Sequence, residues 1–98
     1  MFARVSTLHG SPDKVEEAIR AVQEQVVPAS RQISGFKGIL ALGDRASGKM
    51  IGITLWETEE AMRQSEEAAN ELRRTSADAG AAEIASVERF EVVVNETA

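Results

Sequence analysis

The stretch GITLWETEEAM, residues 52–62, determines two consecutive elements of the fold. A smooth apolar run ends at Trp56, which is the only tryptophan in the chain. Thr58 is a residue type that caps helix N-termini, and the acidic Glu59 and Glu60 suit the first turn of a helix because they complement its dipole. The stretch therefore predicts a strand that closes at Trp56 and a helix that begins after Thr58.

The same criteria, applied to the flanking sequence, predict a complete order of elements. Ser11 and Pro12 open a first amphipathic helix, and Pro28 is expected to end or kink it. Strands are predicted over residues 2–8, 36–42, 49–56 and 84–94, a hairpin turn over 43–48, and a loop over 76–83. The resulting β-α-β-β-α-β order predicts an α+β, ferredoxin-like fold, with a four-stranded antiparallel sheet and two helices on one face.

Length and composition restrict the class of protein. The 98 residues favour one domain over 1–98, and a chain without cysteine fits a reducing, cytoplasmic setting. The net charge of −5 and the scattered basic residues argue against nucleic acid and anionic membranes as partners. No apolar run approaches the roughly 20 residues of a membrane span.

The two central strands are apolar on both faces, which is unusual for a sheet covered by helices on one side only. In residues 50–56, Ile51, Ile53 and Leu55 lie on one face of the strand. The residues that alternate with them, up to Trp56, lie on the other face. An uncovered apolar face of this size is normally an interface, so the sequence predicts a homodimer through the helix-free sheet face. On the outer strands, Arg4 is expected to pair with Glu91.

Three side chains are candidates for a site, each with a structural alternative. His9 is the only histidine and is either a general base or an exposed turn residue. Trp56 either stacks on an aromatic ligand or seals the sheet edge. Arg4 either anchors a carboxylate or enolate or forms an interface ion pair. His9 and Trp56 are predicted to lie roughly 20 Å apart within one subunit.

The second helix carries small residues toward the sheet, among them Ser65 and Ala69. They predict either close packing of the helix on the sheet or a cavity beneath it. The acidic pair Glu66 and Glu67 is expected on the solvated face. One histidine, no cysteine and exposed acids argue against a metal site.

The pattern Ser-Gly-Phe-Lys-Gly followed by Gly-Lys-Met-Ile-Gly-Ile-Thr-Leu-Trp-Glu-Thr-Glu-Glu-Ala-Met resembles the antibiotic biosynthesis monooxygenase family, within the dimeric α+β barrel superfamily. The resemblance implies a homodimer with a small-molecule cavity between sheet and helices in each subunit. Members of this family oxygenate electron-rich aromatics without metal or flavin, and others degrade haem. The residues that the haem-degrading branch uses correspond to about Ala3, Ser65 and Thr75 here, and none matches.

The leading hypothesis is a cofactor-independent monooxygenase that acts on a small aromatic or enolisable compound. In that mechanism the deprotonated substrate itself supplies the electrons. The expected catalytic residue is His9; the expected substrate-binding residues are Trp56, Ser65, Ala69 and Arg4; no metal or cofactor is expected. The alternative is a non-catalytic homodimer of the same fold that binds a small ligand or is structural.

Overall fold

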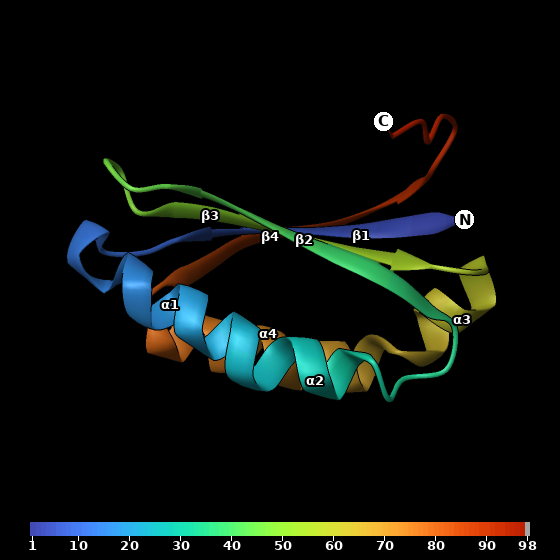
Figure 1. Cartoon of the computed structure of the whole chain (residues 1–98), viewed down its shortest axis with the longest axis horizontal. Helices are drawn as coiled ribbons and strands as arrows, with labels where there is room; N and C mark the ends of the chain where they lie inside the picture. The colour runs from blue at the N-terminus through green and yellow to red at the C-terminus, as the bar shows by residue number, and fades with distance from the viewer. Residues whose placement is uncertain (98) are drawn as a thin grey trace.

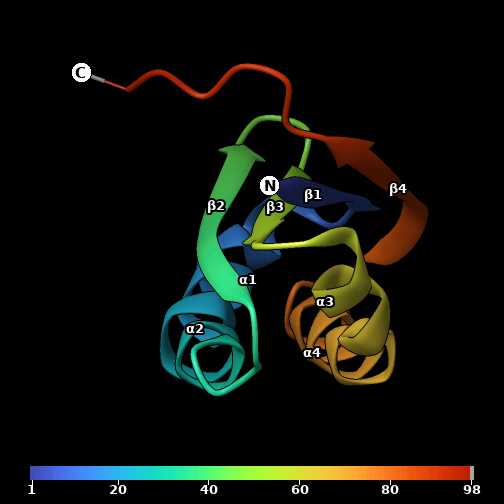
Figure 2. The same ribbon diagram turned by 90° about the vertical axis from the view of Figure 1, so that its right-hand side faces the viewer.

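The computed structural model describes residues 1–97 and has the predicted two-layer architecture. The elements in chain order are β1 (Phe2–His9), η1 (Pro12–Lys14), α1 (Val15–Ala21), η2 (Val22–Val26), α2 (Val27–Ser30), β2 (Phe36–Asp44), β3 (Lys49–Trp56), α3 (Glu59–Gln64), α4 (Glu66–Ala79) and β4 (Glu83–Glu91). Figure 1 shows the sheet as one layer, with all helices on its lower side. Viewed end-on, two helical columns lie side by side under the sheet (Figure 2).

The sheet has the strand order β2-β3-β1-β4, and the three strand pairings are antiparallel. This is the topology that the ferredoxin-like prediction requires. In the central pair, Phe2 lies opposite Trp56, Ser6 opposite Gly52, and His9 opposite Lys49. His9 and Trp56 therefore lie at opposite ends of the β1–β3 ladder, as predicted.

The first helical column continues through Pro28, so this residue does not end the helix. Pro28 has no N–H to donate, and in an α-helix its ring would clash with the carbonyl of Glu24. The turn before it, η2, is π-helical, with the N–H of Val27 donating to the carbonyl of Val22. We attribute this wider turn to Pro28, because it changes the hydrogen-bond register where the proline cannot take part. The column ends only at Ser30.

Other element boundaries also differ from the sequence prediction, most clearly those of the second helix and the last strand. Helix α4 extends to Ala79, so the first half of the expected loop over 76–83 is helical, and Gly80 follows the helix end. Strand β4 ends at Glu91, three residues earlier than predicted. The hairpin turn and the cap at Thr58 are confirmed: the Thr58 hydroxyl accepts a hydrogen bond from the N–H of Ala61 at 3.0 Å.

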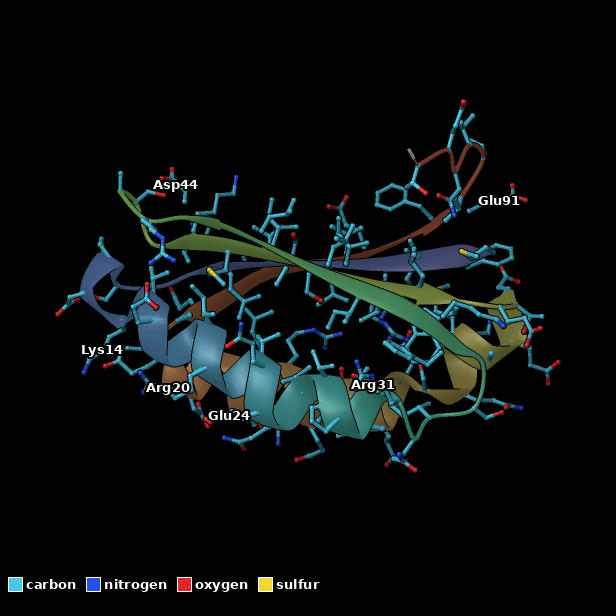
Figure 3. The ribbon with its side chains drawn as sticks, in the orientation of Figure 1. Lys14, Arg20, Glu24, Arg31, Asp44 and Glu91 are labelled. Carbon is cyan, nitrogen blue, oxygen red and sulfur yellow. The ribbon has the colours of Figure 1, made fainter. Side chains whose placement is uncertain are left out.

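The core lies between the sheet and the helices. Figure 3 shows side chains filling this layer, while the labelled Arg20 and Glu24 project away from it on the outer side of the helices. The opposite sheet face carries large apolar side chains that are open in the single subunit, such as Leu40 at 57% and Phe90 at 51% exposed. Within residues 1–97, no helix combines the length and the apolar character that a membrane crossing requires.

Candidate functional site: a cavity between sheet and helices

A cavity of about 100 Å³ lies between the helical layer and the sheet. Its wall is mostly apolar and is built largely from small side chains. Residues from both helical columns and from the central strands contribute, including Ala18, Val22, Ala41, Ala69 and Leu72. A cavity between helix and sheet was one of the two possibilities open from the sequence; of the two small residues named there, Ala69 lines the cavity and Ser65 does not.

Gly52 opens the centre of the sheet toward this cavity. Side chains alternate between the two sheet faces along β3, so Gly52 lies on the same face as Thr54 and Trp56, which also line the cavity. A Cβ atom placed on Gly52 would meet no other atom within 4 Å. Glycine in the interior of a strand weakens it and often marks a place where another group approaches closely. Here the missing side chain leaves space between the middle of the sheet and the helices.

Arg4 projects from β1 into the same layer and is only 2% exposed. Its Nη2 donates to the carbonyl oxygen of Met62 at 2.6 Å and to Oγ of Ser65 at 2.9 Å. The same nitrogen lies 3.1 Å from a carboxylate oxygen of Glu66. These partners come from α3, from α4 and from Ser65 between them, so the helices hold one side of the guanidinium in place.

The other side of the Arg4 guanidinium has no protein partner. Nε and Nη1 are buried, and neither has a hydrogen-bond partner. A buried polar group without a partner costs free energy, so such groups are rare in folded proteins. Arg4 lines the cavity, which makes these two nitrogens the outstanding polar feature of the site.

Trp56 closes one end of the cavity. It is 1% exposed, and the guanidinium carbon of Arg4 lies 5.4 Å from the centre of its ring, within cation–π range. The ring also meets Phe36 edge-on, with ring centres 5.7 Å apart, and its Nε1 donates to Oγ1 of Thr54 at 2.9 Å. Trp56 thus seals the sheet end and forms part of the cavity wall at the same time.

The carboxylate of Glu66 forms ion pairs with two guanidinium groups. Arg89 on β4 donates to its carboxylate through Nε at 2.7 Å and Nη2 at 2.8 Å, and Arg4 approaches from the other side. The hydrogen bonds from Arg89, followed by those from Arg4, lower the pKa of Glu66 to about 2. Conversely, Glu66 raises the pKa of Arg89, while burial lowers the pKa of Arg4.

Arg73 brings a further guanidinium to the cavity wall. It extends from α4, its Nε donates to Oγ of Ser6 at 2.9 Å, and its Nη1 donates to Oδ1 of Asn70 at 2.6 Å. Burial lowers the pKa of Arg73, and repulsion by Arg4 adds to this effect. The ionisable residues of the cavity lining are Arg4, Arg73 and Lys14, all of them basic.

The structure brings the predicted substrate-binding residues together. Arg4, Trp56 and Ala69 line the cavity, and Ser65 lies behind Arg4 as a hydrogen-bond partner. The expected Arg4–Glu91 pair is wrong, because Arg4 points into the helix-covered layer and lies opposite Arg89 in the strand register. Its carboxylate partner is Glu66, which is therefore not on the solvated face as predicted, in contrast to its exposed neighbour Glu67.

His9 lies apart from this cluster. It is exposed at the hairpin end of the sheet, paired with Lys49 and Glu83 in the two neighbouring strands. It is absent from the residues that line the cavity of its own subunit. The role of His9 as a general base therefore stays a prediction.

Sequence reasoning missed three residues of the site, namely Gly52, Glu66 and Arg73. Helical spacing could have indicated two of them. Glu66 and Arg73 lie three and four residues from Ala69, so all three residues share one helix face. Gly52 carried a weaker signal, because a glycine inside a strand fits a bulge as well as an open site.

No family model matches the chain. The curated relatives include the uncharacterized protein Rv2558 of Mycobacterium tuberculosis, which is 39% identical over 77 residues. That match covers 79% of this chain but 33% of the relative. A second relative from the same organism, the uncharacterized protein Rv2557, is 33% identical over 78 residues and is covered to 35%. The chain thus spans about a third of the length of the curated relatives it matches.

Solved structures share the fold over the whole chain. A putative antibiotic biosynthesis monooxygenase from Deinococcus radiodurans superimposes with a TM-score of 0.73 at 16% identity, covering 100% of both chains. A dimeric ferredoxin-like protein from an uncultured marine organism gives 0.74 at 12%, again with 100% of both chains covered. The monooxygenase ActVA-Orf6 of Streptomyces coelicolor, solved with nanaomycin D, gives 0.67 at 16%, covering 98% of this chain and 92% of that one.

These likenesses establish the class of fold. The chain has the ferredoxin-like α+β fold of the proteins named antibiotic biosynthesis monooxygenases, as the sequence pattern predicts. At these identities the agreement concerns the backbone architecture. The function of this chain has to be argued from its own cavity.

Proposed function

We propose that residues 1–98 form one domain that assembles as a homodimer through the helix-free sheet face. The cavity of each subunit then binds a small aromatic or enolisable compound, which reacts with oxygen without a cofactor. The observation that carries the proposal is the cavity itself, an apolar space opened by Gly52 and closed at one end by Trp56. Apolar cavities with a few convergent polar groups are the usual form of small-molecule sites.

The proposed reaction needs little from the protein. A substrate carbon that has lost a proton forms a C–O bond with oxygen, which gives a peroxide on that carbon. Loss of water then breaks the O–O bond, so a CH₂ group becomes a carbonyl, with one oxygen atom in the product and the other in water. The substrate supplies the electrons, and the protein binds it, stabilises the anion and excludes bulk water.

Support for the dimer comes from the open apolar sheet face. Leu40 and Phe90 are about half exposed there, and the chain continues from β4 into a tail with the exposed Val93 and Val94. Figure 2 shows that this tail runs over the helix-free side of the sheet. A second copy would cover this surface, and a fold relative is named as a dimeric ferredoxin-like protein.

A non-catalytic ligand-binding homodimer is the second candidate. It is favoured by one observation, namely that no histidine, aspartate or glutamate is among the described residues that line the cavity. A proton acceptor for the substrate is therefore not supplied by the wall of the same subunit. His9 would have to act on the cavity of a partner subunit.

Oxygen uptake on addition of anthrone tests the catalytic proposal. We expect uptake by the wild type and its loss in Gly52→Leu, whose side chain would fill the cavity, whereas Gly52→Ala should retain much of the rate. Loss of uptake in folded His9→Ala would support the predicted base. No uptake with anthrone or with quinol compounds, despite binding, would favour the non-catalytic alternative.

A further inference from the structure

The cavity concentrates positive charge in an acidic protein. The chain carries a net charge of −5, yet the cavity wall has three basic residues and, among the described residues, no acidic one. Just behind the wall, one carboxylate, that of Glu66, faces the guanidinium groups of Arg4 and Arg89, and all three act on the pKa of Arg73. Three guanidinium charges against one carboxylate leave a surplus of two positive charges.

This surplus of positive charge raises the free energy of the folded protein unless a negative charge neutralises it. Arg4 is almost fully buried and keeps Nε and Nη1 without partners, and the neighbouring Arg73 lies within its repulsive field. In a low-dielectric site, like charges repel strongly and unpartnered donors lose their hydration. A negatively charged oxygen at the Arg4 end of the cavity would relieve both penalties.

The rest of the wall defines the body of such a ligand. Beyond Arg4 and Arg73 the cavity surface is predominantly apolar, with Leu72 and Val22 among its larger side chains. Gly52 contributes no side chain at the centre of the sheet, and a Cβ atom there would meet no other atom within 4 Å. An apolar, flat body over Gly52 with an oxygen anion toward Arg4 satisfies both parts of the site.

The geometry points to an organic anion as the cavity's ligand: an apolar body with a carboxylate or enolate oxygen held by Arg4, with Arg73 as a second anchor. This inference rests on the proposed function only in using the same cavity. It specifies the charge of the ligand and predicts discrimination against neutral and cationic molecules of the same shape. Guanidinium groups suit this task because they remain charged and donate several hydrogen bonds from a planar group.

A charge series of equal shape tests the inference without any need for turnover. Benzoate, benzamide and benzamidine carry charges of −1, 0 and +1 on one framework, and the matching 2-naphthyl compounds extend the series in size. Binding is measured by calorimetry and by the emission of Trp56, which reports on the cavity because it is the only tryptophan. We expect the carboxylates to bind at least about tenfold more tightly than the amides, and the amidines to be excluded.

Arg73→Met tests the anchor, because it removes one charge from a partly buried helix position. It should weaken carboxylate binding about tenfold and leave amide binding unchanged. Arg74→Met is the matched control, since Arg74 lies on the same helix but pairs with Glu71 on the exposed surface. Arg4→Lys, which retains the charge beside Glu66, should fold and should keep a preference for the carboxylates.

The absorbance of 4-nitrophenol separates the two sources of the anion. If the cavity accepts a phenolate or enolate, binding should lower the apparent pKa of 4-nitrophenol, and Arg73→Met should reduce this shift. If the protein binds benzoate but does not lower the apparent pKa of 4-nitrophenol, the anion that the cavity accepts is a carboxylate. Either result supports an organic anion.

Equal affinity for benzoate and benzamide would overturn the inference, as would tighter binding of benzamidine or no binding by any member of either series. The outcome is separable from that of the oxygen assay. Anion-selective binding without oxygen uptake would contradict the proposed function alone. Oxygen uptake from a neutral substrate, unchanged in Arg73→Met, would contradict the anion inference alone.

Discussion

The guanidinium carbon of Arg4 lies 5.4 Å from the centre of the Trp56 ring, and both side chains are almost completely buried. One is charged and the other is the largest apolar side chain in the chain, yet they occupy the same end of the cavity. The helices fix Arg4 through Met62, Ser65 and Glu66, so the contact does not depend on a ligand. The protein thus holds a positive charge against an aromatic ring inside an apolar space.

The first prediction concerns the pH dependence of stability. The pKa of Glu66 is lowered to about 2 in the folded protein, below its value of 4.5 in the absence of these contacts. The stabilisation by its charge is therefore fully present above about pH 4.5 and is lost as the pH falls through about 2. We expect Glu66→Gln to lower the free energy of unfolding at pH 7 by about 1–2 kcal/mol, allowing for solvent screening.

Urea denaturation of wild type and Glu66→Gln between pH 7 and pH 2 measures this effect. The difference between the two proteins should shrink as the pH falls below about 4.5 and should be mostly lost at pH 2. Glu67→Gln is the control, because Glu67 is exposed and next in sequence. A difference that stayed constant over this range would show that the Glu66 charge is not responsible.

The second prediction concerns the close approach of Gly35 to the second helical column. Gly35 has a φ of +83°, and a Cβ atom there would lie 2.4 Å from Cβ of Ala61. Gly35→Ala combines backbone strain with a clash, so we expect it to destabilise the fold by about 1–3 kcal/mol in thermal or urea unfolding. Gly52→Ala, where the new methyl group meets open space, should change stability by less than about 1 kcal/mol. Equal effects at the two positions would contradict the packing described here.

The third prediction concerns the open sheet face. Leu40 is 57% exposed there and lies opposite Ile53 in the β2–β3 ladder. A charge at this position should disfavour burial against a second copy, so Leu40→Glu should shift the protein from dimer to monomer at micromolar concentration. Sedimentation equilibrium measures the shift, with Gln25→Glu on the exposed helical surface as the control of equal charge change. A monomeric wild type at this concentration would contradict the proposed homodimer.

The fold was predictable because each element carries its own local signal. Strand β3 reads as an apolar run that stops at Trp56, and Thr58 caps the helix that follows, as the hydrogen bond from Ala61 confirms. Local sequence signals failed where the same composition fits two kinds of secondary structure. The segment after Thr75 is rich in small polar residues and alanine, which suits a loop as well as a helix end, and the helix in fact continues to Ala79.

The site was predictable only in part, because it depends on how the helices are rotated against the sheet. The small residues of the second helix indicated that space was possible, and the structure places the two candidates Arg4 and Trp56 at the cavity wall. Which carboxylate meets Arg4 could not be read from the sequence, since Glu91 is near it along the sheet while Glu66 reaches it only through tertiary packing. The unpaired nitrogens of Arg4 are likewise a property of packing.

A crystal structure of the protein grown with benzoate tests the central claim most directly, namely that the cavity beside Arg4 and Trp56 is the ligand site. The account predicts a benzoate ring over Gly52, with carboxylate oxygens within hydrogen-bond distance of Nε or Nη1 of Arg4. It would be contradicted by a cavity closed by protein side chains, or by benzoate bound only at the protein surface while Arg4 keeps its present contacts.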